Sequence, residues 1–160
     1  MKDVTISQAV RYVGVDDKTI DLFEGQYKVP NGVSYNSYVI LDEKVAVMDT
    51  VDKRATAEWL ANLEAVLDGR KPDYLVITHM EPDHAGSVQV LAEKYPGMEL
   101  IASVKAVSML PQFFTMENVG CRCRGVKEGD TQSLGEHTLH FVMAPMVHWP
   151  EVMVAYGVSG

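Results

Sequence analysis

The chain has 160 residues, enough for one domain with a hydrophobic core. Its formal net charge of −8 disfavours non-specific binding to nucleic acid, which requires a basic surface. No apolar stretch is long enough to cross a membrane, and residues 1–5 lack the apolar region of a secretion signal. Cys121 and Cys123 are too close in an extended strand for a relaxed disulfide. We therefore expect a cytoplasmic protein with no membrane or nucleic-acid partner.

The first half of the chain predicts short strands followed by one helix. Residues 34–41 and 45–48 are two predicted strands on either side of the polar turn at residues 42–44, and together they predict a β-hairpin. Apolar side chains recur at helical spacing over residues 59–67, and Gly69 is placed to end that helix. Residues 74–77 are continuously apolar, as expected of a strand covered on both faces.

The next segment predicts a helix, a strand and another helix. The first helix covers residues 88–95 and ends at Pro96, and residues 100–102 form the strand. Ser103 is placed to cap a helix that continues through Leu110, which we expect Pro111 to help terminate.

The last segment returns to strands. We expect them at residues 120–126, 137–144 and 152–156, with a turn over residues 127–130. Strands first, then strand and helix in alternation, predict an α/β (α+β) fold in which helices stack on a mixed sheet.

Four potential metal ligands directly follow the apolar strand at residues 74–77: His79, Glu81, Asp83 and His84. His148 follows another predicted strand, and loops beyond the carboxyl ends of strands are where sites form in layered α/β folds. Three imidazoles and two carboxylates suit a pair of redox-active iron ions better than thiolate or all-histidine sets do. The alternative is that the carboxylates are solvated turn residues and the histidines only cap helices.

The remaining candidates have simpler interpretations. The two cysteines have no second pair nearby, so ordinary packed thiols are favoured over a metal site. His137 and His140 are expected to be exposed or packed. Asp49 follows a strand and is expected to support the site or a turn without being a ligand.

Two motifs together resemble those of the flavodiiron proteins, or A-type flavoproteins, of the metallo-β-lactamase-like superfamily. They are His-x-Glu-x-Asp-His at residues 79–84 and His-Trp-Pro-Glu at residues 148–151. Residues 31–38 and 48–52 are also similar to the early hairpin region of that family. Hydrolases of the superfamily usually have a second histidine where this chain has Glu81, and the glutamate is the family's mark of a redox iron site.

The resemblance implies an αββα sandwich of which residues 1–160 form the amino-terminal half, a partial di-iron domain. It implies reduction of O2 to water or of NO to nitrous oxide at a non-haem di-iron centre. His79, Glu81 and His148 would bind one iron, and Asp83 and His84 the other. It also implies a homodimer and an electron supply from a flavodoxin-like FMN domain or a rubredoxin-type protein.

The chain departs from the family pattern because it ends before a bridging aspartate, a further histidine ligand and the FMN domain. We therefore expect weakened metal binding, no FMN bound to this chain, and an exposed apolar sheet face. Two alternatives stay open: a metallo-β-lactamase-like hydrolase that uses metal-bound hydroxide, and a non-catalytic fragment or subunit that needs a partner chain.

Overall fold

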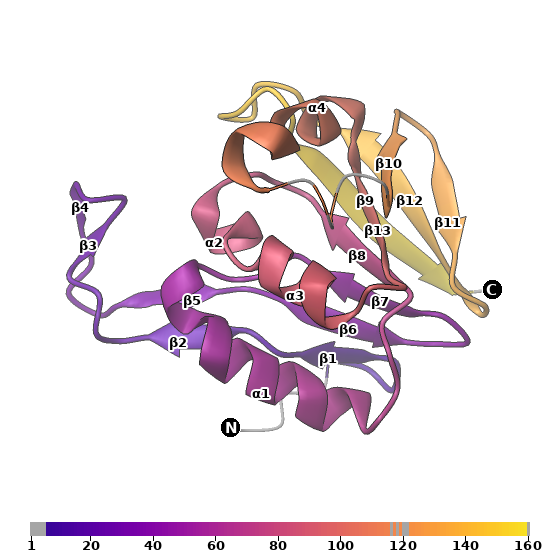
Figure 1. The fold of residues 1–160 in the computed structure, drawn as a ribbon, viewed down its shortest axis with the longest axis horizontal. Helices are drawn as coiled ribbons and strands as arrows, with labels where there is room; N and C mark the ends of the chain where they lie inside the picture. Colours follow the sequence, from indigo (N-terminus) through magenta and orange to yellow (C-terminus); the bar gives the residue numbers. More distant parts are fainter. Residues whose placement is uncertain (1–5, 116, 118, 120–121, 160) are drawn as a thin grey trace.

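A six-stranded mixed sheet forms the centre of the computed structural model, which describes residues 6–115, 117, 119 and 122–159 (Figure 1). Its strands, in spatial order, are β1 (Val10–Tyr12), β6 (Tyr38–Leu41), β7 (Val45–Met48), β8 (Tyr74–Ile77), β9 (Glu99–Ser103) and β10 (Cys123–Val126). Strands β1, β6 and β7 pair antiparallel, whereas β7 to β10 pair parallel. The carboxyl ends of β7, β8 and β9 therefore meet at one edge of the sheet.

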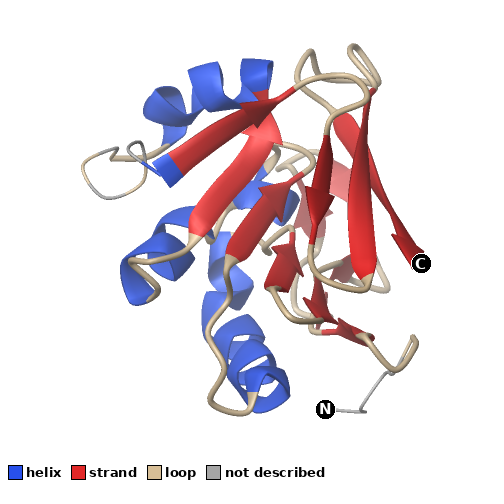
Figure 2. Ribbon diagram, turned by 90° about the vertical axis from the view of Figure 1, so that its right-hand side faces the viewer, coloured by secondary structure: helices blue, strands red, loops and turns tan. Residues whose placement is uncertain are grey.

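Helices cover one face of this sheet, as Figure 2 shows from the side. They are α1 (Thr56–Leu67), α3 (Val88–Lys94) and α4 (Val104–Phe113), with the short η1 (Lys53–Ala55) and α2 (Pro82–Ala85) in the loops. Trp59 and Leu63 of α1 are fully buried in one core with alternate strand residues such as Val47 and Leu75. The strands therefore bury one set of alternate side chains under the helices.

A second sheet packs on the opposite face. It consists of β11 (Thr131–Ser133), β12 (His137–Met143) and β13 (Met153–Ser159), all antiparallel. Phe141 and Leu139 pack there against the other set of strand residues, including Val76 and Ile101. Helices, mixed sheet and second sheet make three layers of the predicted sandwich, which confirms the predicted α/β class.

Two small antiparallel pairs extend the first half of the chain. They are β2 (Val15–Asp17) with β5 (Val33–Tyr35), and β3 (Leu22–Phe23) with β4 (Tyr27–Lys28). The β3–β4 hairpin projects from the rest of the chain in Figure 1.

The outer face of β13 is apolar and about half exposed at Val154, Tyr156 and Val158. These three side chains give the second sheet a partly exposed apolar outer face. None of the helices in the described ranges is both long and apolar enough to cross a membrane.

Several predicted elements are confirmed: the β6–β7 hairpin, α1, α3 and β8. The single strand predicted over residues 34–41 is wrong. The chain breaks between β5 and β6, where the Ser37 hydroxyl turns to donate to the Asp49 carbonyl at 2.9 Å.

Two further predictions need correction or fall partly outside the described residues, and one strand was not predicted. Helix α4 continues past Pro111 to Phe113, because Pro111 lies in its last turn and leaves only one carbonyl, that of Val107, without its intrahelical N–H. Strand β11 was not predicted. Cys121 lies outside the described residues, and the Cys123 thiol donates to the Val119 carbonyl at 3.0 Å.

Candidate metal centre

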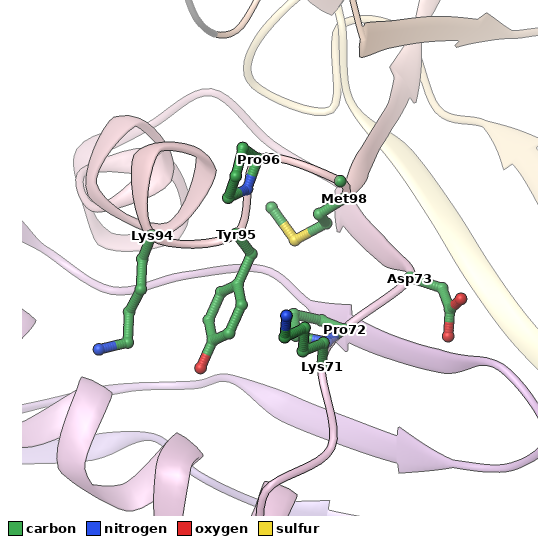
Figure 3. Close-up of a pocket in the computed structure, with 8 residues that line it drawn as sticks. Lys71, Pro72, Asp73, Lys94, Tyr95, Pro96 and Met98 are labelled. Atoms are coloured by element: carbon green, nitrogen blue, oxygen red, sulfur yellow. The ribbon is translucent and has the colours of Figure 1, made fainter.

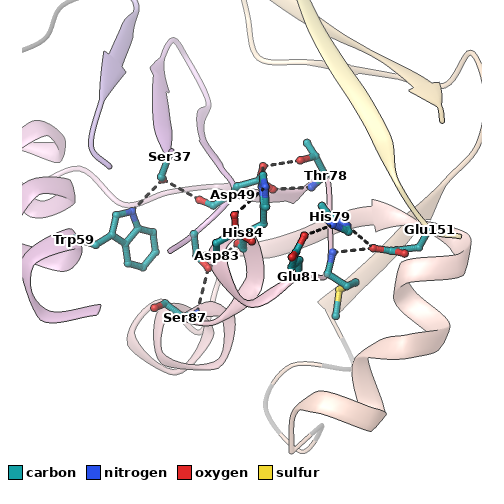
Figure 4. Close-up of polar contacts among 12 residues, drawn as sticks. Ser37, Asp49, Trp59, Thr78, His79, Glu81, Asp83, His84, Ser87 and Glu151 are labelled. Carbon is teal, nitrogen blue, oxygen red and sulfur yellow. Dashed lines mark hydrogen bonds and ion pairs between the residues drawn. The ribbon is translucent and has the colours of Figure 1, made fainter. Parts of the chain in front are cut away.

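The predicted ligands gather at the carboxyl edge of the central sheet, in the loops that follow its strands and in one loop of the second sheet. Figure 4 shows His79, Glu81, Asp83 and His84 there. The segment after β8 carries His79 and Glu81 and then enters α2, which carries Asp83 and His84. Parallel pairing of β7 with β8 places Asp49, directly after β7, beside this segment. His148 comes from the loop between β12 and β13.

Three donor atoms converge tightly. The Nε2 atom of His79 lies 2.9 Å from Oε2 of Glu81 and 3.0 Å from Nε2 of His148. The third side of the triangle, from His148 Nε2 to Glu81 Oε2, is 3.2 Å. Two ligands that each lie about 2.1 Å from one metal ion at a right angle are about 3.0 Å apart. The triangle therefore has the dimensions of neighbouring ligands on a single ion, and it contains the three residues predicted for the first metal.

The electrostatics of this cluster favour a bound cation. His79 and Glu81 are each only 6% exposed. Burial raises the pKa of Glu81 to about 7, helped by a hydrogen bond that the protonated carboxyl donates to Glu24 and by the negative charge of Asp83, while His148 opposes the shift. The raised pKa means that the protein alone stabilises the ionised form of Glu81 only weakly. A metal ion at this position would stabilise that ionised form.

Asp83 and His84 form a second group beside the first. Nε2 of His84 lies 3.6 Å from Oδ2 of Asp83, and the His79 and His84 rings are 5.3 Å apart between centroids. Oδ1 of Asp83 is buried and has no hydrogen-bond partner among the described residues. An orphaned carboxylate oxygen beside an imidazole fits a second cation, although these two residues lie outside the three-donor cluster.

Asp49 holds this second group in place. Its backbone has φ of 56°, a left-handed conformation that aspartate tolerates. Its carboxylate accepts from the Thr78 N–H at 2.7 Å and lies 2.9 Å from Nδ1 of His84. Burial alone would lower the pKa of His84, but the Asp49 carboxylate raises it above the ordinary value.

A buried hydrogen-bonded chain connects Asp49 to helix α1. The Trp59 indole donates to the Ser37 hydroxyl at 3.0 Å, and that hydroxyl donates to the Asp49 carbonyl. On the other side of the site, the Trp149 ring stands perpendicular to His79, with centroids 5.2 Å apart. Both tryptophans therefore fix the surroundings of the cluster.

The sequence analysis assigns no individual role to two residues near the site, although one of them, Glu151, ends the His-Trp-Pro-Glu motif at residues 148–151. Glu151 places Oε1 2.7 Å from Nδ1 of His79, and its position three residues after His148 was the only available signal. Glu24, at the tip of the β3–β4 hairpin, contacts Glu81. The two residues are far apart in the sequence, so no local pattern predicts this contact.

The other histidines lie elsewhere. Nδ1 of His137 is 2.8 Å from Oδ2 of Asp42, and the His140 ring stacks on Tyr156. A cavity of about 520 Å³ near Tyr95 and Met98 lies at the amino ends of β8 and β9, the opposite edge of the sheet (Figure 3). Its one carboxylate, from Asp73, is paired with Lys44, so this cavity is a poor candidate for metal chemistry.

Known proteins resemble this chain over nearly its whole length. Residues 33–159 match the family described as ODP family beta lactamase. The anaerobic nitric oxide reductase flavorubredoxin of Aliivibrio salmonicida is 37% identical over 96% of this chain and 31% of its own length. The nitric oxide reductase of Moorella thermoacetica is 35% identical, over 96% of this chain and 38% of its own length. The chain thus spans about a third of these relatives.

Solved structures share the fold. The flavodiiron protein of Giardia intestinalis superposes with a TM-score of 0.90 at 31% identity, over 98% of this chain and 38% of that one. The rubredoxin oxygen:oxidoreductase of Desulfovibrio gigas superposes with a TM-score of 0.90 at 34% identity, over 97% of this chain and 38% of that one.

Proposed function

The chain belongs to the ODP family of beta-lactamase domains, and we propose that it is the metal-binding part of a flavodiiron-type oxidoreductase. Its fold is the metallo-β-lactamase-like core of flavodiiron proteins, as the two sequence motifs predict. The proposed reaction is the reduction of O2 to water or of NO to nitrous oxide at a non-haem di-iron centre. The names of the relatives support both substrates, since one is a nitric oxide reductase and another an oxygen oxidoreductase.

The convergence of His79, Glu81 and His148 is the observation that carries this proposal. Two imidazole nitrogens and a carboxylate oxygen suit iron, and no described cysteine takes part. Glu81 adds negative charge where a third imidazole would be neutral, which favours the more oxidised states of a redox metal.

We propose the same ligand assignment that the resemblance implies. His79, Glu81 and His148 bind one iron, and Asp83 with His84 binds the other. The metals supply electron transfer and hold the diatomic substrate. The protein supplies a buried pair of ligands in His79 and Glu81, and an exposed one in His148, whose side chain is 61% exposed.

Electrons must reach this site from another group. We propose that they come from a flavodoxin-like FMN domain or a rubredoxin-type protein, and that the chain works as a homodimer in the cytoplasm. The similarity to a flavorubredoxin and to a rubredoxin oxygen:oxidoreductase supports such donors.

Metal analysis tests the proposal directly. The chain is purified without oxygen, supplied with Fe(II), and its iron content is measured beside its consumption of O2 and NO with a chemical reductant. Iron binding that is lost in His79→Ala supports the proposal. Zinc binding without iron binding, together with turnover of a lactam or ester, would instead identify a hydrolase of the same fold.

A further inference from the structure

Glu151 connects the two loops that carry the metal ligands. It is 2% exposed and lies three residues after His148 in the loop between β12 and β13. Its Oε1 atom is 2.7 Å from Nδ1 of His79 and 2.9 Å from the backbone nitrogen of Met80 (Figure 4). Its backbone carbonyl accepts from the Ser103 hydroxyl at 2.7 Å, so the residue is also fixed to the end of β9.

These contacts determine which nitrogen of His79 carries the proton. The Met80 N–H can only donate, so Oε1 of Glu151 is an acceptor. An acceptor oxygen at 2.7 Å from Nδ1 requires Nδ1 to be the protonated nitrogen of the ring. The other nitrogen, Nε2, faces Oε2 of Glu81 at 2.9 Å and Nε2 of His148 at 3.0 Å, so it is the nitrogen whose lone pair a metal ion in this cluster would take up.

We propose that Glu151 is the positioning residue of the metal site, one that holds His79 in the Nδ1–H tautomer and so presents Nε2 as a ligand. The inference rests on the proposed metal site. A carboxylate behind the ring also raises the basicity of the ligating nitrogen, which strengthens metal binding. Glu151 is not itself a ligand in this assignment.

The surroundings of Glu151 do not favour a carboxylate on packing grounds alone. Its Oε2 atom is buried and has no hydrogen-bond partner among the described residues. Glu151 is among the residues that line a pocket of about 270 Å³, together with Val126, Met143 and Pro145. A half-satisfied carboxylate against apolar walls costs free energy, and an apolar side chain of similar length would pack there at lower cost.

The same contacts link the exposed ligand to the buried one. His148 is largely exposed, whereas Glu151 next to it is anchored at both its side chain and its backbone. Glu151 therefore holds the end of the loop at a fixed distance from His79, which limits how far His148 can move from the other two donors.

Two substitutions of nearly equal size separate positioning from packing. In Glu151→Gln the Met80 N–H selects the amide oxygen at the Oε1 position, so the His79 tautomer is retained although the charge is lost. In Glu151→Met no acceptor remains, and the ring is free to place its proton on Nε2. We expect Fe(II) affinity to fall by about 10–100-fold in Glu151→Met and by less in Glu151→Gln, as for other residues behind a metal-bound histidine.

The tautomer is read on the metal-free chain by ¹⁵N NMR of labelled histidine at about pH 8, where an ordinary imidazole is neutral. The expected result is a protonated Nδ1 in the wild type and in Glu151→Gln, and loss of the Nδ1 proton in Glu151→Met, where the Glu81 carboxylate still lies 2.9 Å from Nε2. Glu128→Met is the control, because Glu128 lines the same pocket and its carboxylate accepts from the Met143 N–H, not from His79 or Met80. It should change neither the tautomer nor the Fe(II) affinity.

A folded Glu151→Met chain that keeps both the wild-type tautomer and the wild-type affinity would overturn the inference. If instead the wild type binds no iron but the tautomer responds to Glu151 as expected, the proposed function fails and the positioning of His79 stands. The two failures are therefore distinguishable.

Discussion

The Nε2 atoms of His79 and His148 lie 3.0 Å apart although 69 positions separate the two residues. One follows a strand of the central sheet, and the other comes from the loop between two strands of the second sheet. The packing of the two sheets against each other therefore assembles the donor cluster. Metal binding should in turn stabilise that packing, because a ligand that binds only the folded state shifts the folding equilibrium.

His148→Ala tests whether the exposed histidine is a ligand. The side chain is 61% exposed, so its loss should change the free energy of unfolding of the metal-free chain by no more than about 0.5 kcal/mol. Fe(II) affinity should fall by more than the roughly 10–100-fold expected for a residue behind a ligand. Titration of Fe(II) and thermal unfolding with and without metal measure both effects. Unchanged affinity would remove His148 from the ligand set.

Asp49→Asn tests the support of the second metal position. Asparagine tolerates the left-handed backbone, and its oxygen can still accept from the Thr78 N–H. Its NH2 group then faces Nδ1 of His84 and drives the ring proton to Nε2, the atom near Asp83. We expect a destabilisation of about 1–3 kcal/mol and weaker binding of a second Fe(II), with the first little affected.

Asp130→Asn is the matched control for this change. Its carboxylate accepts from the Lys127 N–H in a turn between β10 and β11, so the same loss of charge occurs away from the ligands. Equal losses of the second Fe(II) in both variants would contradict the role given to Asp49.

The parts of this site that sequence predicts are those encoded within a few residues. The ligands from His79 to His84 are visible because they lie within six residues that follow the buried strand β8. The role of Glu151 was not predictable, because its partner His79 lies 72 positions away and only the packed sheets bring them together. Glu24 is hidden for the same reason, since its hairpin has no metal-site pattern of its own.

The fold shows the same division. Strand β8 and helix α1 are predicted because their apolar periodicity is local and matches their burial. The break at Ser37 depends on Asp49 and Trp59, which come later in the chain, so the local pattern of residues 34–41 predicted one strand where there are two. The hydrogen bonds that Ser37 makes with Asp49 and Trp59 outweigh the local strand propensity there.

Asp42 should give the chain an acid-sensitive connection between its two sheets. It lies after β6 and accepts from the backbone N–H groups of Glu43, Glu136 and His137, the last at the start of β12. Burial alone would raise the pKa of Asp42, but these donors, led by His137, lower it to about 2. Because the folded pKa lies below the unfolded value of about 3.9, the ionised group stabilises the fold above about pH 4.

This stabilisation should be lost as the pH falls from about 4 to 2. We expect it to contribute roughly 1–2 kcal/mol, after allowance for screening by solvent. Denaturant unfolding across this range should show a shallower pH dependence in Asp42→Asn than in the wild type. Asp68→Asn, at the exposed end of α1, should keep the wild-type slope. Identical slopes for wild type and Asp42→Asn would refute the assignment.

Gly86→Ala should disturb the metal centre through the backbone alone. Gly86 ends the short helix α2 that carries Asp83 and His84. A Cβ at this position would lie 2.6 Å from the Pro82 carbonyl oxygen and 2.8 Å from the Lys53 backbone nitrogen, both too close for ordinary contact. The helix must therefore move away from the segment after β7, at a cost of about 1–3 kcal/mol. We expect weaker Fe(II) binding together with a lower free energy of unfolding.

Gly97→Ala is the control, since a Cβ there meets nothing within 4 Å, and alanine should leave Fe(II) binding unchanged and stability equal or slightly higher. Wild-type Fe(II) affinity in Gly86→Ala would show that α2 does not position metal ligands.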